Sequence, residues 1–147
     1  MTEEDDRLRA ILTSARSIAV VGASEKPERP SHNVMRFLQY AGYRILPINP
    51  LLAGSTLLGE TVHATLRDVS EKIDMVDIFR AGAHVLPVVE EAIEIGVRVV
   101  WMQLGVVNAE AAARAQAAGL QVVMNRCPKI EWARLQLSLP AAGRTES

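Results

Sequence analysis

The 147-residue sequence has one cysteine, few aromatic side chains and no apolar run of membrane-spanning length. Because Cys127 has no second cysteine to pair with, an internal disulfide is excluded and a reducing compartment is favoured. Aromatic residues make up 4% of the chain and the formal net charge is −1, so neither base stacking nor a basic surface indicates nucleic-acid binding. The acidic N-terminus also lacks the features of a secretory signal. We therefore expect a cytoplasmic protein with neither a nucleic-acid nor a membrane partner.

The sequence also lacks a recognisable catalytic or metal-binding pattern. Its three histidines, His32, His63 and His84, follow no metal-ligand spacing, and each is predicted to be solvated or to cap a helix. No nucleophile has an identifiable base and orienting partner, and no pair of carboxylates has a suggestive spacing. We therefore expect no metal site and no catalysis by this chain alone.

Short apolar runs alternate with amphipathic segments along the chain. The runs predict strands at 17–21, 43–49, 73–78, 97–102 and 120–125, with a further short strand near 61–62. Helices are predicted after Thr2, after Ser31, over 84–96, after Asn108, and from Pro128 to Leu139. This order indicates an α/β protein with a three-layer Rossmann-like fold, in which helices cover both faces of a mainly parallel sheet of about five to six strands. One domain is expected, with its core at 17–139 and a frayed tail at 140–147.

The segment after the first predicted strand has the composition of a phosphate-binding turn. Small residues there would let a phosphate approach backbone N–H groups, and two basic side chains flank the turn. A serine that caps the next helix would direct the positive end of the helix dipole to the same place. The residues concerned are Gly22, Ala23, Ser24, Lys26, Arg29 and Ser31. The alternative is a tight turn with solvated basic residues, since the usual dinucleotide fingerprint has three glycines where this segment has one.

The second predicted strand ends at Asn49 and Pro50, where proteins that bind NAD usually have Asp or Glu to contact the adenosine ribose. The absence of a carboxylate disfavours NAD. A ligand with a phosphate on that ribose, such as NADP or coenzyme A (CoA), is easier to accommodate.

Further candidates follow the later strands, because ligands of open parallel sheets bind beyond the carboxyl ends of the strands. Phe79 either continues the core or covers an adenine or pantetheine group, and Arg80 is either a phosphate partner or a surface residue. Gln103, before Gly105, is placed to hydrogen-bond pantetheine amides or a neighbouring loop. Cys127 is either inert packing or a contact for the CoA thiol.

The motifs "VVGAS", "GY.ILPINP", "DMVDIFR" and "VVMNRC", in this order, resemble the small stand-alone CoA-binding proteins of bacteria and archaea. That family shares its fold with the CoA-binding domain of the succinyl-CoA synthetase α subunit, and the resemblance runs from about Ser17 to Leu135. It implies a Rossmann-like CoA-binding domain, with the phosphate turn at 22–24 and further walls at 49–50, 79–80 and 103–105. The phosphorylated histidine of the synthetase belongs to a following domain, and no histidine here has a matching context.

Three functions remain open at this stage. The leading one is binding of CoA or an acyl-CoA by a non-catalytic carrier, sensor or regulatory module. The second is an NADP- or CoA-dependent enzyme component whose missing catalytic groups come from a partner chain. The third is a vestigial Rossmann domain that acts only through protein contacts, and a homo-oligomer is compatible with each.

Overall fold

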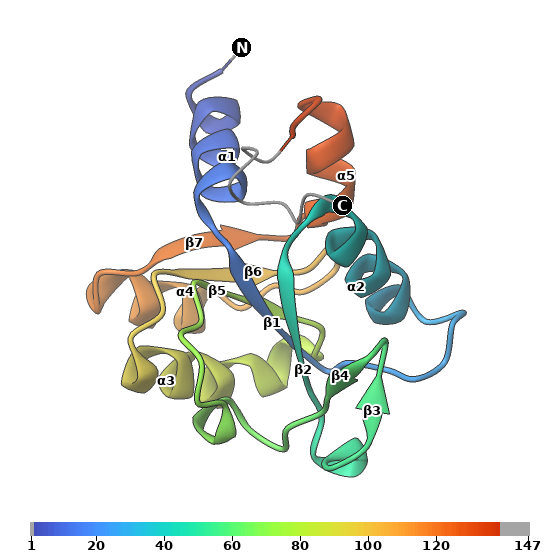
Figure 1. The fold of residues 1–147 in the computed structure, drawn as a ribbon. Helices are drawn as coiled ribbons and strands as arrows, with labels where there is room; N and C mark the ends of the chain where they lie inside the picture. The colour runs from blue at the N-terminus through green and yellow to red at the C-terminus, as the bar shows by residue number, and fades with distance from the viewer. Residues whose placement is uncertain (1, 139–147) are drawn as a thin grey trace.

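The computed structural model describes residues 2–138 and shows a parallel sheet at the centre of the molecule (Figure 1). The sheet has five strands in the order β2-β1-β5-β6-β7, and each neighbouring pair is parallel. The strands are β1 (Ser17–Val21), β2 (Arg44–Ile48), β5 (Met75–Ile78), β6 (Val99–Met102) and β7 (Gln121–Met124). The predicted parallel sheet is therefore confirmed.

Helices cover both faces of this sheet, as predicted. On one face lie α1 (Glu3–Ser14), α2 (Pro30–Ala41) and α5 (Pro128–Arg134), and on the other lie α3 (Val85–Ile95) and α4 (Ala109–Ala117). Short 3-10 turns occur at Pro50–Leu52, Leu66–Asp68 and Gly82–His84. Within residues 2–138, no helix is both long and apolar enough to cross a membrane.

Most residues of the strands are apolar because both faces of the sheet are covered. All five residues of β1 are buried, and they alternate between two cores. Ile18 and Val20 belong to the core under α1, α2 and α5, whereas Ala19 and Val21 belong to the core under α3 and α4. The side chains of β1 therefore pack against helices on both faces of the sheet, which gives the molecule three layers.

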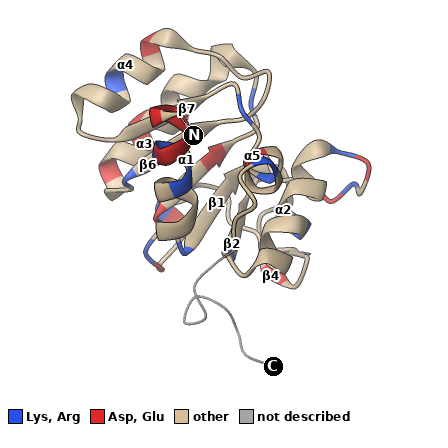
Figure 2. Cartoon of the chain, turned by 90° about the horizontal axis from the view of Figure 1, so that it is seen from above, with Lys and Arg blue, Asp and Glu red and all other residues tan. Residues whose placement is uncertain are grey.

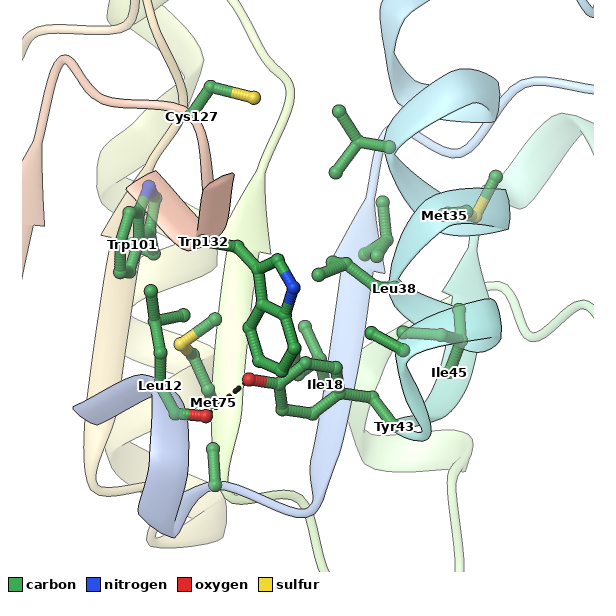
Figure 3. Close-up of a cluster of buried hydrophobic side chains, with 14 of the residues drawn as sticks. Leu12, Ile18, Met35, Leu38, Tyr43, Ile45, Met75, Trp101, Cys127 and Trp132 are labelled. Carbon is green, nitrogen blue, oxygen red and sulfur yellow. Dashed lines mark hydrogen bonds between the residues drawn. The ribbon is translucent and has the colours of Figure 1, made fainter. Parts of the chain in front are cut away.

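Tyr43 connects three elements in the first of these cores (Figure 3). Its hydroxyl donates to the carbonyl of Leu12, one of the carbonyls that the end of α1 leaves without an intrahelical partner. Its ring meets Trp132 of α5 edge-on, with 5.7 Å between the ring centroids. Burial raises the pKa of the Tyr43 hydroxyl, so the group stays a hydrogen-bond donor at neutral pH.

The segment after β2 contains a hairpin of which the sequence predicted only the second strand. β3 (Thr56–Leu57) pairs with β4 (Glu60–Thr61) in antiparallel fashion. Leu58 and Gly59 connect them with φ values of +50° and +81°, as a type I′ turn requires. Leucine rarely adopts this left-handed conformation, so the sequence of the turn did not indicate a hairpin.

Two predicted helix boundaries are wrong. Ser31 is not the N-cap of α2, because the helix begins at Pro30, whose fixed φ suits a first helical position, and Arg29 takes the cap position. The last helix ends at Arg134 instead of Leu139, since Gln136 adopts a φ of +53°. The N–H of the residue after Gln136 then bonds back to the helix in a Schellman closure. Leu139 and the predicted tail at 140–147 lie outside the described residues.

We predict that Tyr43→Phe lowers the free energy of unfolding by about 1 to 3 kcal/mol, because it leaves the buried Leu12 carbonyl without a donor. Tyr40→Phe is the matched control, since Tyr40 is 91% exposed and should lose almost nothing. Urea denaturation of both variants measures the difference. Equal stability of the two variants would contradict a structural role for the Tyr43 hydroxyl.

Candidate functional site

A cleft lies beyond the carboxyl ends of the strands, where the strand order reverses between β1 and β5. Its walls come from the turn after β1, the first turn of α2, the ends of β2, β5 and β6, and the start of α5. The cavity volume is about 1260 Å³, whereas pockets for drug-sized ligands span about 300 to 1,000 Å³. The cleft therefore has room for an extended ligand.

Most of the residues predicted from the sequence line this one cleft. They are Gly22, Ala23, Ser24, Lys26, Arg29, Ser31, Asn49, Phe79, Arg80, Gln103 and Cys127. Pro50 and Gly105, which were also predicted, are not among the residues that line it. Pro50 is exposed and begins a 3-10 turn after β2. Gly105 has a φ of +89° and its N–H donates to Asn125 Oδ1 at 2.8 Å, so it shapes the loop after β6.

The single glycine of the turn is required by a close approach between two strand ends. Gly22 has a φ of +91°, and a Cβ added there would lie 2.2 Å from the backbone oxygen of Phe79, at the end of β5. No side chain fits in that space. The turn therefore needs a glycine at position 22, where the two strand ends come this close.

The backbone donors of the turn differ from the predicted phosphate cradle. The N–H groups of Gly22 and Ala23 both donate to the carbonyl of Ile48, at 3.0 and 3.2 Å, and are already used within the sheet. Within residues 2–138 the Ser24 N–H has no such acceptor. The side-chain Oγ of Ser24 accepts from the Lys26 N–H at 3.1 Å. An anion at this turn would therefore meet Ser24 and the first turn of α2.

Two side chains hold the turn in this shape. His32, in the first turn of α2, is buried and donates from Nδ1 to the Ser24 carbonyl at 2.9 Å. A carbonyl only accepts, so the proton must be on Nδ1. Asn49 donates from Nδ2 to the Ala23 carbonyl at 2.7 Å and accepts from the Leu51 N–H at 2.9 Å.

The expectation of a solvated or helix-capping histidine is wrong for His32. Its spacing in the sequence carried no signal for this contact, which depends on how α2 packs against the turn. His84 is exposed and lies directly before α3, without a side-chain capping bond. Among residues 2–138, no cluster of three or more His, Cys, Asp or Glu residues is arranged to hold a metal ion.

Positive side chains gather at the same end of the cleft. Lys26, Arg29 and Arg80 line it, and none of them forms a salt bridge within residues 2–138. Most arginines elsewhere have carboxylate partners; Arg67, for example, pairs with Glu91 and Glu94 of α3. Figure 2 shows positive and negative segments together in the loop that leads into α2, where Glu28 also lines the cleft. The cationic side chains of the cleft therefore remain available to an anionic ligand.

The opposite end of the cleft is largely uncharged. Leu104 and Ile130 line it and are 57% and 51% exposed, and beside them lie the buried Val106 and Cys127. Lys129 also lines the cleft, with its ammonium group 2.6 Å from Asn33 Oδ1 and above the Phe37 ring of α2. A bound ligand with an apolar segment would cover the exposed side chains.

A buried carboxyl group lies under this uncharged end. Asp77, on β5, is fully buried, and in residues 2–138 it has no salt-bridge partner, whereas the buried Glu131 of α5 pairs with Arg126 and Arg134. Burial raises the pKa of the Asp77 carboxyl well above its ordinary value.

The partner of Asp77 is Gln103, which lines the cleft. One end of the Gln103 amide lies 3.1 Å from Asp77 Oδ1 and 3.2 Å from Oδ2; with the nitrogen at that end, the amide donates to an ionised Asp77. A hydrogen bond to an ionised group is worth about 1.5 to 3 kcal/mol, whereas burying an ion costs several kcal/mol. The neutral acid is therefore the favoured form of Asp77.

These features define a Rossmann-like α/β protein with a cleft at the reversal of strand order. The chain belongs to the CoA binding domain family, whose pattern matches residues 16–133. It is 37% identical over 123 residues to "Uncharacterized protein YneT" of Bacillus subtilis (strain 168), and the match covers 84% of this chain and 90% of that protein.

Two solved structures have a similar fold. A hypothetical protein from Pyrococcus horikoshii OT3 has a TM-score of 0.87 and 40% identity, covering 93% of this chain and 94% of that chain. Acetyl-coenzyme A synthetase 1 from Ca. Korarchaeum cryptofilum has a TM-score of 0.68 and 26% identity, covering 80% of this chain and 28% of that one.

We predict that Gly22→Ala lowers the free energy of unfolding by more than about 2 kcal/mol, because the new Cβ meets the Phe79 oxygen. Gly119→Ala is the matched control: its φ is +90°, but nothing lies within 4 Å of the added Cβ, so only the left-handed backbone penalty of about 1 to 2 kcal/mol applies. Chemical denaturation compares the two variants. A smaller loss for Gly22→Ala than for the control would refute the close-approach argument.

We also predict that Asp77→Asn changes the pH dependence of stability. The pKa of Asp77 is raised in the folded protein, so its stabilising contribution is complete below the unfolded pKa of about 3.9 and is lost as pH rises through the folded pKa. The variant, which has no titrating group at this position, should gain stability relative to the parent as pH increases. Urea denaturation at a series of pH values measures this, and parallel profiles for the two proteins would contradict it.

Proposed function

We propose that this protein binds CoA or an acyl-CoA in the cleft and acts as a carrier, sensor or regulatory module without catalysing a reaction itself. The observation that carries the proposal is the division of one cleft into a cationic end at the turn after β1 and a largely uncharged end at β6 and α5, where the ammonium group of Lys129 is bonded to Asn33. CoA has the same division, with phosphates at one end and a long uncharged pantetheine arm at the other. Membership of the CoA binding domain family supports this ligand.

The cationic end has the groups that phosphates require. Ser24 and Ser31 line the cleft with hydroxyl groups, and the Ser31 N–H belongs to the first turn of α2, where backbone donors lack intrahelical acceptors. Lys26, Arg29 and Arg80 add positive charge without carboxylate partners in the described part of the chain. These five residues would hold the phosphates of CoA. Because no internal salt bridge has to break first, the attraction between the cations and the phosphates would contribute to the binding free energy without that cost.

The end of β2 disfavours NAD. Asn49 stands where a carboxylate would bond both ribose hydroxyls of NAD, and its amide group already contacts the Ala23 carbonyl and the Leu51 N–H. A phosphate on the ribose meets no negative charge from Asn49. The ribose phosphate of CoA is therefore compatible with this wall.

The proposal of a non-catalytic role rests on the side chains that line the cleft. Cys127, the only thiol, has no hydrogen bond to a histidine within residues 2–138, and the Nδ1 of His32 is bonded to a backbone carbonyl. One alternative has a specific observation in its favour. The match to acetyl-coenzyme A synthetase 1 covers 28% of that longer chain, so this protein could instead supply the CoA-binding part of an enzyme that a partner chain completes.

We predict that CoA binds more tightly than 3′-dephospho-CoA, and that both bind more tightly than NAD. The reason is the unpaired positive charge at the turn together with the missing carboxylate at Asn49. Isothermal titration calorimetry with the three ligands gives the order directly. Tighter binding of NAD than of CoA would overturn the proposed function.

We further predict that Ser24→Asp weakens CoA binding at least about tenfold, which corresponds to about 1.4 kcal/mol, because it adds a negative charge beside the expected phosphate position. Ser24→Ala is the control: it removes one hydroxyl but keeps the backbone donor, and should lose much less. The melting temperature without ligand should change little, since Ser24 is partly exposed in a turn. A folded Ser24→Asp variant with parental affinity would show that the phosphates bind elsewhere.

A further inference from the structure

Asp77 is a polar side chain at the centre of the sheet that the fold itself does not explain. It lies between Val20 on β1 and Trp101 on β6, its partners in strand register, and it is fully buried. An apolar residue would suit that position better, since the neighbours in register are apolar. Within residues 2–138, Asp77 forms no salt bridge with a cationic side chain. Its carboxyl group contacts Gln103, which lines the cleft.

The contact between Asp77 and Gln103 has two possible arrangements. An ionised Asp77 accepts from the Gln103 nitrogen, which directs the Gln103 oxygen away from Asp77. A protonated Asp77 donates to the Gln103 oxygen, which directs the Gln103 NH₂ group away from Asp77 instead. The proton on Asp77 therefore decides whether Gln103 presents a donor or an acceptor. Because burial without a cation favours the neutral acid, the second arrangement is the favoured one.

Gln103 lies at the uncharged end of the cleft. It follows β6, which is two strands away from β1 and its turn, a separation of about 10 Å at the usual strand spacing. Val106 and Cys127 line the same end. If the phosphates bind at the turn, the pantetheine arm of CoA extends toward Gln103. The polar groups of that arm include amide carbonyls and, in an acyl-CoA, the thioester carbonyl, and each of these needs a hydrogen-bond donor.

We propose that Asp77 and Gln103 act as a unit in which protonated Asp77 donates to Gln103 Oε1, so that Gln103 Nε2 faces the cleft and donates to a carbonyl oxygen on the ligand's pantetheine or acyl arm. Asp77 is a positioning residue, and Gln103 is the residue that touches the ligand. The proposal rests on the proposed function, since it assigns the ligand's arm to the β6 end of the cleft.

Three variants test this unit. Asp77→Asn keeps a donor for Gln103 Oε1, Asp77→Val removes the donor while suiting a buried strand, and Gln103→Glu replaces the donating amide by a group that accepts. Each is titrated calorimetrically with acetyl-CoA and with adenosine 3′,5′-bisphosphate, which has a ribose phosphate but no arm. We expect Asp77→Val and Gln103→Glu to weaken acetyl-CoA binding at least about fivefold while bisphosphate binding stays within about twofold, and Asp77→Asn to keep the affinity for both.

Several results would overturn the inference. One is parental affinity of Asp77→Val for acetyl-CoA, and another is an equal loss for acetyl-CoA and bisphosphate, which would indicate a general structural effect. Failure of the parent protein to bind either ligand would instead refute the proposed function, so the two failures are distinguishable.

Infrared spectroscopy gives a second measurement that needs neither ligand nor the Asp77→Val variant. The difference spectrum between the parent protein and Asp77→Asn at pH 7 should contain the carbonyl band of a protonated carboxyl group. A difference spectrum that shows only carboxylate bands would mean that Asp77 is ionised and that Gln103 presents its oxygen to the cleft, which would overturn the proposal.

Discussion

The contact between Gly22 and the end of β5 is the constraint on which the site depends. Three strand ends meet there: Gly22 follows β1, its N–H bonds to the last residue of β2, and its Cα faces the Phe79 carbonyl after β5. Because β2 and β5 flank β1 on opposite sides, this is also the point where strand order reverses. The cleft lies above this junction, so the same close packing that joins the strands forms its floor.

The junction also determines which groups remain for a ligand. Backbone donors at the start of the turn bond to the sheet, and the side chains of His32 and Asn49 hold the carbonyls that follow. What remains is the Ser24 N–H, the first turn of α2 and side chains from separate elements. A rigid turn that offers few but oriented donors lowers the entropy lost on binding an anion.

Charge is distributed unevenly over the molecule, and this difference gives the cleft its chemical character. Arginines on the outer surfaces bond to carboxylates, as Arg44 and Arg67 do, whereas the basic side chains at the turn have no carboxylate partner among residues 2–138. At the other end, apolar side chains surround the buried Asp77 and Gln103 pair. An extended ligand with phosphates at one end and an uncharged arm at the other matches both parts.

The parallel α/β sheet could be predicted from the residue pattern, because near-continuous apolar runs separated by amphipathic segments have few other ways to bury their side chains. Most of the residues that line the cleft could also be predicted, since the carboxyl ends of parallel strands lie at one edge of the sheet. The other features follow from how the elements pack in three dimensions. The role of His32 depends on how α2 packs against the turn before it, and the role of Asp77 depends on its contact with Gln103 after the neighbouring strand. The Leu58 turn and the Gln136 helix end adopt backbone conformations that their residue types do not favour. Such contacts arise from packing, and no local pattern of residues predicts them.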